Sequence, residues 1–254
     1  MEAGKLFNIL DSIDSTNNYA MGQVHAGLAQ TGMAWFALEQ WAGKGQRGRH
    51  WKSKPGENIL MSVVFAPDPS QKAFPFLFSI RVALVVRDLV AKYLPGSVTI
   101  KWPNDIYFND RKAGGILIEN TYQGTNWTWA IVGIGININQ TAFPKDLPNP
   151  VSVKKITNQD YDVLSLAREL HQNLLTALSN PSENADLLLE TYNSQLYARG
   201  KKVKLKKQNQ VFETEIIGVD LQGKLLTKDI LEREFSVGEV EMLNHEPEPG
   251  NTAY

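Results

Sequence analysis

The sequence contains no cysteine. This absence excludes disulfide bonds, thiolate nucleophiles and cysteine-ligated zinc sites, and it is compatible with a reducing compartment. The sequence also lacks any run of 18 apolar residues, and the apolar stretch that begins at Leu6 is too short for a signal peptide. We therefore expect a cytoplasmic protein with no membrane partner.

The chain has almost no excess charge of either sign. Its 26 lysines and arginines oppose 27 aspartates and glutamates, which gives a net charge of −1 over 254 residues. With 43% apolar residues, it is typical of a globular protein that can bury a full core. General affinity for nucleic acid is not expected from this balance, so any basic segment is a local feature.

Positive charge is concentrated in residues 42–54, where five lysines and arginines occur without an acid. The segment reads Gly43-Lys44-Gly45-Gln46-Arg47-Gly48-Arg49-His50-Trp51, and we call it the basic loop. Glycines at 43, 45 and 48 permit positive φ, so backbone N–H groups and the cationic side chains can surround an anion together. The basic loop therefore predicts a site for phosphate or carboxylate. The alternative is a solvated, mobile loop.

The spacing Gly-x-Gly-x-x-Gly also occurs in dinucleotide-binding folds, where a helix begins inside the motif. Here Pro55 and Gly56 follow too soon for a helix with an apolar stripe. The phosphate-binding loop of nucleotide hydrolases is disfavoured as well, since Arg49 and His50 stand where lysine and serine or threonine belong. Neither nucleotide fold is expected.

A lysine ends a short predicted strand at residues 97–101. Strand alternation puts Val98 and Ile100 on the core face and Lys101 on the opposite face, at the strand end. An ammonium fixed there could neutralise a carboxylate and a phosphate together, as activation of an acid by ATP requires. The alternative is an ordinary solvated lysine.

Two later strands carry unusual glycines. Residues 113–119 open with Gly114 and Gly115, which either admit a close neighbour or form a simple bulge. In residues 127–139, alternation separates a branched apolar face from a face with Gly133, Gly135, Asn137 and Asn139. That second face predicts a bare floor for a ligand, ending in carboxamides that match the edge of adenine.

Earlier in the chain, Ser15, Thr16 and Asn17 precede a short predicted helix. The simplest interpretation is that Ser15 caps the helix. The functional alternative is that this helix N-terminus binds a polar group of a ligand.

The segments described above occur in the same order in the biotin protein ligases, and the chain resembles that family. The basic loop is similar to their glycine- and arginine-rich loop over biotinyl-adenylate. Lys101-Trp102-Pro103-Asn104-Asp105 matches their most characteristic pentapeptide, and two further blocks match at Gly115-Ile116-Leu117-Ile118-Glu119 and Gly133-Ile134-Gly135-Ile136-Asn137. The resemblance covers residues 6–139 closely and the remainder loosely.

The resemblance implies a role for each matching residue. Lys101 would meet the biotin carboxylate and the α-phosphate, and it is expected to be catalytic together with Arg47 and Arg49. Biotin would contact Lys101 and also Ser15, Thr16, Asn17, Gln40, Gly43, Lys44, Gly45, Gln46, Gly114 and Gly115. ATP or the adenylate would contact Lys101 and also Arg47, Gly48, Arg49, Trp51, Asn104, Gly133, Gly135 and Asn137.

The implied reaction has two steps: biotin and ATP form biotinyl-5′-AMP and pyrophosphate, then a lysine of a biotin carboxyl carrier protein, such as that of acetyl-CoA carboxylase, takes the biotin. Family members use Mg²⁺, whose ligands the sequence does not identify. This chain has Gln46 where relatives often have arginine, and no aromatic residue near Pro150 where some stack a tryptophan on adenine. Retention of the adenylate and adenine stacking are therefore open.

The implied fold is α+β: a mixed or antiparallel sheet flanked by helices, as in class II synthetases and biotin or lipoate ligases, followed by a small SH3-like β-barrel. We expect a catalytic domain at 1–199, the barrel at 200–245 and a tail at 246–254. Predicted helices include residues 73–93, 161–178 and 186–197. The core begins near residue 6, so no N-terminal DNA-binding domain and no DNA binding are expected.

Two other functions stay open. A lipoate or octanoate protein ligase or transferase has the same fold class, although the basic loop argues against it. A non-catalytic module could use the basic loop on nucleic acid, which the neutral charge disfavours. The oligomeric state is also open, and a homodimer is compatible with the sequence.

Overall fold

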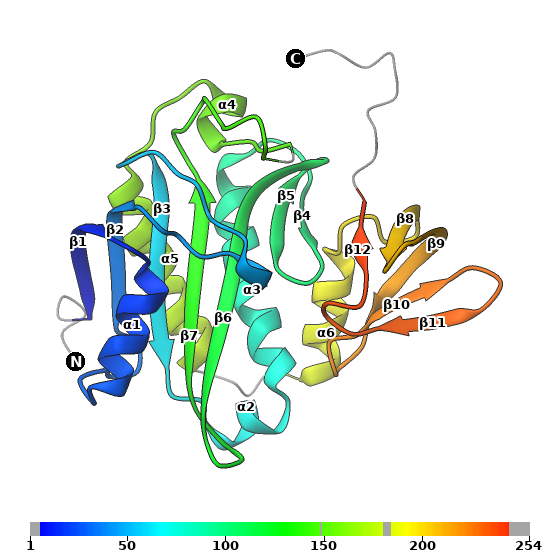
Figure 1. The fold of residues 1–254 in the computed structure, drawn as a ribbon, viewed down its shortest axis with the longest axis horizontal. Helices are drawn as coiled ribbons and strands as arrows, with labels where there is room; N and C mark the ends of the chain where they lie inside the picture. The colour runs from blue at the N-terminus through cyan, green and yellow to red at the C-terminus, as the bar shows by residue number, and fades with distance from the viewer. Residues whose placement is uncertain (1–5, 148, 180–183, 244–254) are drawn as a thin grey trace.

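A seven-stranded mixed sheet forms the centre of the larger part of the chain (Figure 1). The computed structural model describes residues 6–147, 149–179 and 184–243. The strands are β1 (Phe7–Ile13), β2 (Ala34–Gln40), β3 (Asn58–Phe65), β4 (Val98–Lys101), β5 (Asp105–Phe108), β6 (Arg111–Gln123) and β7 (Asn126–Asn137). Their order is β1-β2-β3-β7-β6-β5-β4, in which β1 is parallel to β2 and the other neighbours are antiparallel.

Helices cover both faces of this sheet. The short helix α1 (Thr16–His25) lies on one face, and α3 (Pro75–Tyr93) and α5 (Val163–Ser179) lie on the other (Figure 1). All eight residues of β3 are buried, because this strand is covered from both sides. On the α5 side, Leu166, Leu170 and Leu174 are buried in the core.

A second sheet follows α6 (Ala185–Ser194) at the C-terminal end (Figure 1). Its strands are β8 (Lys202–Lys207), β9 (Gln210–Val219), β10 (Leu225–Lys228), β11 (Glu232–Phe235) and β12 (Glu241–Met242). They pair antiparallel in the order β11-β10-β9-β8-β12, and we call this the C-terminal sheet. The α+β class and the small C-terminal β unit are thus confirmed.

Two predicted helices have different bounds in the structure. The helix expected at residues 73–93 is α3 and begins at Pro75, because Ala73 ends a separate helix, α2 (Pro69–Ala73), and Pro75 has no N–H to continue that earlier helix. The helix expected to reach residue 197 stops at Ser194. The next residues pair with β4 instead, with Ile100 N–H donating to Gln195 O at 2.8 Å.

A short helix that the sequence did not predict, α4 (Val153–Thr157), precedes α5. Among the described residues, no helix is long and apolar enough to cross a bilayer. The domain boundary at residue 199 stays a prediction, and the expected tail at 246–254 lies outside the described residues.

Candidate active site

A cavity of about 420 Å³ lies where the large sheet, the basic loop and the C-terminal sheet meet. This volume is in the range of small-molecule sites, about 300 to 1,000 Å³. The predicted residues that line it are Ser15, Thr16, Asn17, Gln40, Lys44, Gly45, Gln46, Arg47, Arg49, Trp51, Lys101, Asn104, Gly115, Gly133, Gly135 and Asn137. Residues from segments more than 100 positions apart in the chain therefore form one site.

The floor of the cavity is the glycine face of β7, as predicted. A Cβ atom on Gly133 would collide with the Asn17 carboxamide. A Cβ on Gly135 would lie 2.5 Å from Cε2 of Trp51. The missing side chains are therefore required because α1 and the basic loop approach the sheet closely.

The first residues of α1 form a buried polar network beside this floor. The Thr16 backbone N–H and hydroxyl both donate to Gln40 Oε1, at 2.6 and 3.0 Å. The Ser62 hydroxyl lies 2.7 Å from Thr16 Oγ1 and 2.6 Å from Asn17 Oδ1, and Asn17 Nδ2 donates to Glu119 Oε2 at 2.8 Å. This network holds hydrogen-bond donors and acceptors in fixed positions, where they could bind a polar ring of a ligand.

Ser15 is the N-cap residue of α1, but its hydroxyl makes no capping hydrogen bond. Its side chain is buried, with 1% exposure, and it lines the cavity. The simple capping interpretation of the hydroxyl is therefore wrong. The position agrees with the alternative, in which the hydroxyl faces a ligand.

The basic loop is a narrow hairpin. Trp51 N–H donates to Gly43 O at 2.8 Å, and Gly45 N–H donates to Arg49 O at 2.7 Å. Positive φ was expected at three glycines, but among them only Gly48 has it (72°); Arg47 takes the other left-handed position, with φ 55°. Gly43 is needed for a different reason, since a Cβ there would lie 2.7 Å from Trp51 O.

Acidic side chains contact several cations of this region. Lys44 Nζ lies 3.6 Å from a Glu119 carboxylate oxygen. The Arg49 guanidinium lies 3.0 Å from Glu241 of the C-terminal sheet. These ion pairs are partly exposed, so an anionic ligand in the cavity could compete for the cations at modest cost.

Lys101 reaches the cavity from the end of β4. Its residue exposure is only 9%, and its Nζ lies 3.4 Å from the hydroxyl of Tyr107. Burial lowers the pKa of Lys101 below the usual lysine value, while the nearby Asp105 carboxylate acts in the opposite direction. The next residue, Trp102, also lines the cavity and donates its indole N–H to Gly223 O at 3.0 Å.

Three predicted residues do not line the cavity. Gly43 and Gly48 belong to the hairpin of the basic loop but do not contact the cavity. Gly114 packs strand against strand, because a Cβ there would lie 3.0 Å from Gly135 O. The β5–β6 register also shifts at this point, so a close neighbour and a bulge, which the sequence offered as alternatives, both occur here.

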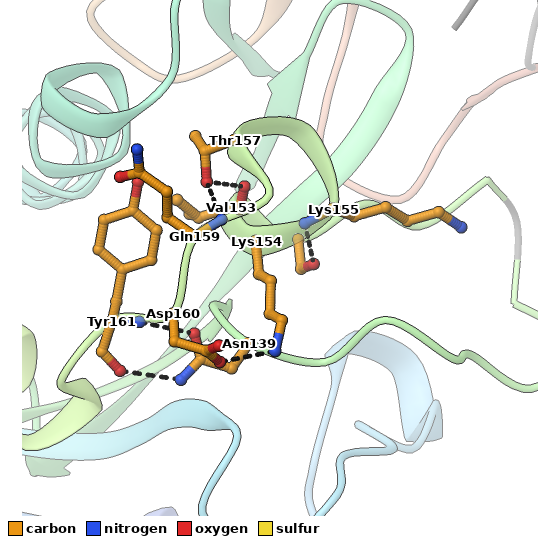
Figure 2. Close-up of polar contacts among 9 residues, drawn as sticks. Asn139, Val153, Lys154, Lys155, Thr157, Gln159, Asp160 and Tyr161 are labelled. Atoms are coloured by element: carbon orange, nitrogen blue, oxygen red, sulfur yellow. Dashed lines mark hydrogen bonds and ion pairs between the residues drawn. The ribbon is translucent and has the colours of Figure 1, made fainter.

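The two carboxamides at the end of β7 have different surroundings. Asn137 lines the cavity, and its Nδ2 donates to Val151 O at 3.0 Å. Asn139 is turned toward the backbone of Tyr161, to which it donates at 2.8 Å and from which it accepts at 3.1 Å (Figure 2). Of the two, only Asn137 remains a candidate for adenine recognition.

Sequence reasoning missed several residues of the site. Lys112 and Asp105 form an ion pair at the cavity wall, with Nζ 2.7 Å from Oδ1, and Lys112 Nζ lies 5.9 Å from the Trp51 ring. Both could have been found, since Asp105 belongs to the quoted pentapeptide and Lys112 shares the strand of Gly115. The C-terminal sheet gave no such signal, although it contributes Leu205, Leu225, Val240, Glu241, Met242 and Leu243.

Residues 9–137 match the sequence profile described as the Biotin/lipoate A/B protein ligase family. The bifunctional ligase/repressor BirA of Bacillus spizizenii is 30% identical over 227 residues, which are 85% of this chain and 67% of that protein. The biotin--[acetyl-CoA-carboxylase] ligase of Paracoccus denitrificans is 35% identical over 161 residues, or 61% of this chain and 65% of that protein. BirA of Escherichia coli is 34% identical over 141 residues, so the chain matches 56% of its own length and 43% of that relative.

Solved structures share the fold over nearly the whole chain. The biotin protein ligase from Aquifex aeolicus in complex with biotin and ATP has a TM-score of 0.79 at 23% identity, covering 95% of this chain and 100% of that one. The biotin protein ligase from Leishmania major in complex with biotinyl-5-AMP has a TM-score of 0.65 at 25% identity, covering 94% and 98%. The large sheet and the C-terminal sheet therefore belong to one known architecture.

Proposed function

Because the chain belongs to the Biotin/lipoate A/B protein ligase family, we propose that it is an ATP-dependent biotin protein ligase. It activates biotin as biotinyl-5′-AMP and transfers the biotin to a lysine of a biotin carboxyl carrier protein. The observation that carries this proposal is the arrangement of the cavity. One buried lysine, one cationic loop and one polar network surround a floor without side chains.

In the first step, a carboxylate oxygen of biotin attacks the α-phosphorus of ATP, and the bond to pyrophosphate breaks. Both reactants are anionic, so the reaction needs positive charge where they meet. Lys101 supplies a buried ammonium at that point, and Arg47 and Arg49 supply guanidinium groups from the basic loop. Guanidinium forks suit phosphate oxygens, so these arginines retain the adenylate.

In the second step, the amine of a carrier lysine attacks the acyl carbon of the mixed anhydride, and AMP leaves with the bonding electrons. The amine must lose its extra proton. Asp105 lines the cavity, paired with Lys112 at 2.7 Å, and its carboxylate is the group that accepts this proton.

The ring of Trp51 lies over Gly135 and offers an aromatic surface for adenine, which the region around Pro150 lacks.

Magnesium stays a prediction. The described residues contain no group of three or more histidine, aspartate or glutamate side chains placed to hold a metal ion. The carboxylates at the cavity are engaged, Asp105 with Lys112 and Glu241 with Arg49. The described part of the chain therefore does not fit a metal site built by the protein alone, and Mg²⁺ would instead enter on the substrate phosphates, as it commonly does in nucleotide sites.

A lipoate or octanoate ligase or transferase is the second candidate. The polar network of Thr16, Asn17 and Gln40 favours biotin, because the donors and acceptors of a ureido ring can exchange hydrogen bonds with these side chains, whereas an alkyl chain cannot. The family description covers both substrate classes, so the choice of biotin rests on this network and on the basic loop.

The cellular setting also stays a prediction. The cysteine-free sequence supports a cytoplasmic location. The near-neutral net charge supports the absence of DNA binding, and a homodimer stays a prediction. The chain spans less than half of the BirA of Escherichia coli, so the activities in that relative's name do not transfer as a whole.

Two measurements test the function. Biotin should support exchange of labelled pyrophosphate into ATP, while lipoate and octanoate should not. With MgATP and biotin, an apo carrier domain should gain the mass of one biotinyl group. Exchange that requires lipoate, or a carrier mass that never changes, would contradict the proposal.

A further inference from the structure

Lys101 is held between two tyrosine rings that come from different parts of the chain. Its Nζ lies 4.9 Å from the ring centre of Tyr107 and 5.8 Å from that of Tyr197. The two rings are 5.2 Å apart and tilted by 48°. Both ammonium-to-ring distances fall within the range of about 6 Å in which a cation is attracted to an aromatic face.

The sheet register places Tyr107. Lys101 of β4 is paired with Asp105 of β5, and Tyr107 lies two residues further along on the same face. Its ring is 4% exposed, so the surrounding sheet fixes its orientation. Tyr107 is therefore a rigid neighbour of the ammonium and not a surface group that can turn away.

Tyr197 is fixed by a different device. It follows α6 and precedes the C-terminal sheet, and its backbone N–H donates to Ile100 O at 2.9 Å. Its hydroxyl donates to Asp110 Oδ1 at 2.7 Å in the turn between β5 and β6. Backbone and side chain are thus both tied to the strands around Lys101, which explains why this segment leaves the helix early.

Both tyrosines remain neutral rings at working pH. Burial raises the pKa of Tyr107 and of Tyr197 above the usual tyrosine value, and neighbouring carboxylates act in the same direction. A neutral ring attracts the ammonium with its face without supplying a full negative charge. It therefore orients a cation and competes less with an incoming anion than a carboxylate would.

We propose that Tyr107 and Tyr197 are positioning residues that hold the Lys101 ammonium toward the cavity and act on the reaction through that lysine. The inference rests on the proposed function. A lysine side chain has four rotatable bonds and loses much conformational freedom when it is fixed. Because the two rings already restrict the Lys101 side chain, it loses less conformational entropy when the anionic reactants bind.

The chain offers a matched control for this arrangement. Lys92 Nζ lies 5.3 Å from the ring of Tyr93, and the Tyr93 and Tyr161 rings are 5.4 Å apart. The Tyr93 hydroxyl also contacts an acid, Glu169, at 3.1 Å. This second lysine–tyrosine–tyrosine group does not line the cavity, so its disruption reports the structural cost alone.

The test compares Tyr197→Leu, Tyr197→Phe and the control Tyr161→Leu in biotin-dependent pyrophosphate exchange. Tyr197→Leu should lower kcat by about tenfold, the scale of a desolvated cation–π contact. Tyr197→Phe keeps the ring and the backbone bond to Ile100 and loses an exposed hydroxyl bond to Asp110, so it should stay within about twofold of the wild type. Tyr161→Leu should stay within the same range. Tyr107→Leu provides a second variant on another element and should resemble Tyr197→Leu.

The decisive measurement combines each leucine variant with Lys101→Ala. If the tyrosines act through Lys101, Tyr197→Leu should cause no further loss in that background. A full tenfold loss there, or a Tyr197→Phe variant as slow as Tyr197→Leu, would overturn the proposal while leaving the function intact. A wild-type protein without biotin-dependent exchange would instead refute the proposed function, and the positioning role with it.

Discussion

The Arg49 guanidinium lies 3.0 Å from the carboxylate of Glu241, although 192 residues separate them in the chain. This pair joins the basic loop to the C-terminal sheet at the mouth of the cavity. Arg47 approaches the same sheet, since its guanidinium lies 3.1 Å from the position a Cβ on Gly238 would take. The C-terminal sheet is therefore the surface against which the basic loop rests.

The first prediction concerns this contact. The side chains of Arg49 and Glu241 are 69% and 51% exposed, so their attraction contributes at most about 1 kcal/mol. Glu241→Gln frees the Arg49 guanidinium for the adenylate phosphate, so it should slow release of biotinyl-5′-AMP by about two- to fivefold at low salt. Added salt should abolish the difference because it screens exposed charges. Release rates measured at two salt concentrations check this.

Lys224 and Glu234 supply the control, since they form a similarly exposed pair, 2.8 Å apart, within the same sheet. Glu234→Gln should leave release of the adenylate unchanged. If it has the same effect as Glu241→Gln, the change reflects the charge of the C-terminal sheet and not the contact with the basic loop.

The second prediction concerns the charge of Lys101. Lys101→Ala should slow adenylate formation by about 100-fold, or about 3 kcal/mol, the scale of losing one buried electrostatic stabiliser. In the wild type, burial lowers the pKa of Lys101. The ammonium should therefore lose its proton, and the rate should fall, at a pH below the usual lysine pKa of 10.5.

Measuring the rate of pyrophosphate exchange as a function of pH shows whether the pKa of Lys101 is lowered, as predicted. Arginine keeps its charge at every accessible pH, so Lys101→Arg should show no alkaline fall from this group, whatever its absolute rate. A wild-type rate that stays constant up to the pH where free lysine titrates would contradict the role of the buried ammonium.

The third prediction concerns the floor of the cavity. Gly135→Ala places a methyl group 2.5 Å from the Trp51 ring, so the indole must move and affinity for the adenylate should fall at least tenfold. Gly22→Ala is the matched control, because a Cβ there meets no atom within 4 Å. That change, inside α1, should stabilise the protein by about 0.5 to 1 kcal/mol. Calorimetric titration with biotinyl-5′-AMP measures the affinity of both variants, which should fall for Gly135→Ala and stay unchanged for Gly22→Ala.

Strand patterns identified part of this site at the sequence level, and the resemblance to biotin protein ligases supplied most of its other residues. Alternation alone separated Lys101 from Val98 and Ile100, and the glycines of β7 from its core-facing residues, because side chains in a strand must point to opposite faces. Each of these assignments depends only on neighbours in the chain. The structure therefore confirms them with the correct face and nearly the correct bounds.

Features that depend on distant contacts could not be read in this way. The segment from Gln195 to Tyr197 contains no helix breaker, and only pairing with Ile100 ends α6 at Ser194. Likewise, Arg47 takes positive φ where Gly45 was expected to, because the hairpin closes between Gly45 and Arg49. A local sequence pattern does not show which distant segment of the chain packs beside it.

The fourth prediction concerns closure of the basic loop. Its glycines and like charges favour an open, mobile state without ligand, while the adenylate would draw the cations inward. Biotin with MgATP should therefore slow tryptic cleavage after Arg47 and Arg49 by at least fivefold relative to ligand-free protein. Mass spectrometry of the early fragments locates the cuts. Equal cleavage with and without the ligands would contradict this.

The last prediction concerns His171, which is 5% exposed in α5. Its Nε2 lies 2.8 Å from Gly32 O, and since a carbonyl only accepts, Nε2 carries the proton. Burial lowers the pKa of His171, so the folded state resists a second proton that the unfolded state accepts near pH 6.5. The free energy of unfolding should therefore fall as pH drops below about 6.5, by up to about 1.4 kcal/mol per unit, until the lowered pKa is passed. Urea unfolding between pH 5 and 7.5 measures this slope.

His171→Gln keeps an N–H donor and should reduce the slope, whereas His25→Gln, at an exposed position in α1, should preserve it. A slope unchanged by His171→Gln would assign the acid sensitivity to other groups.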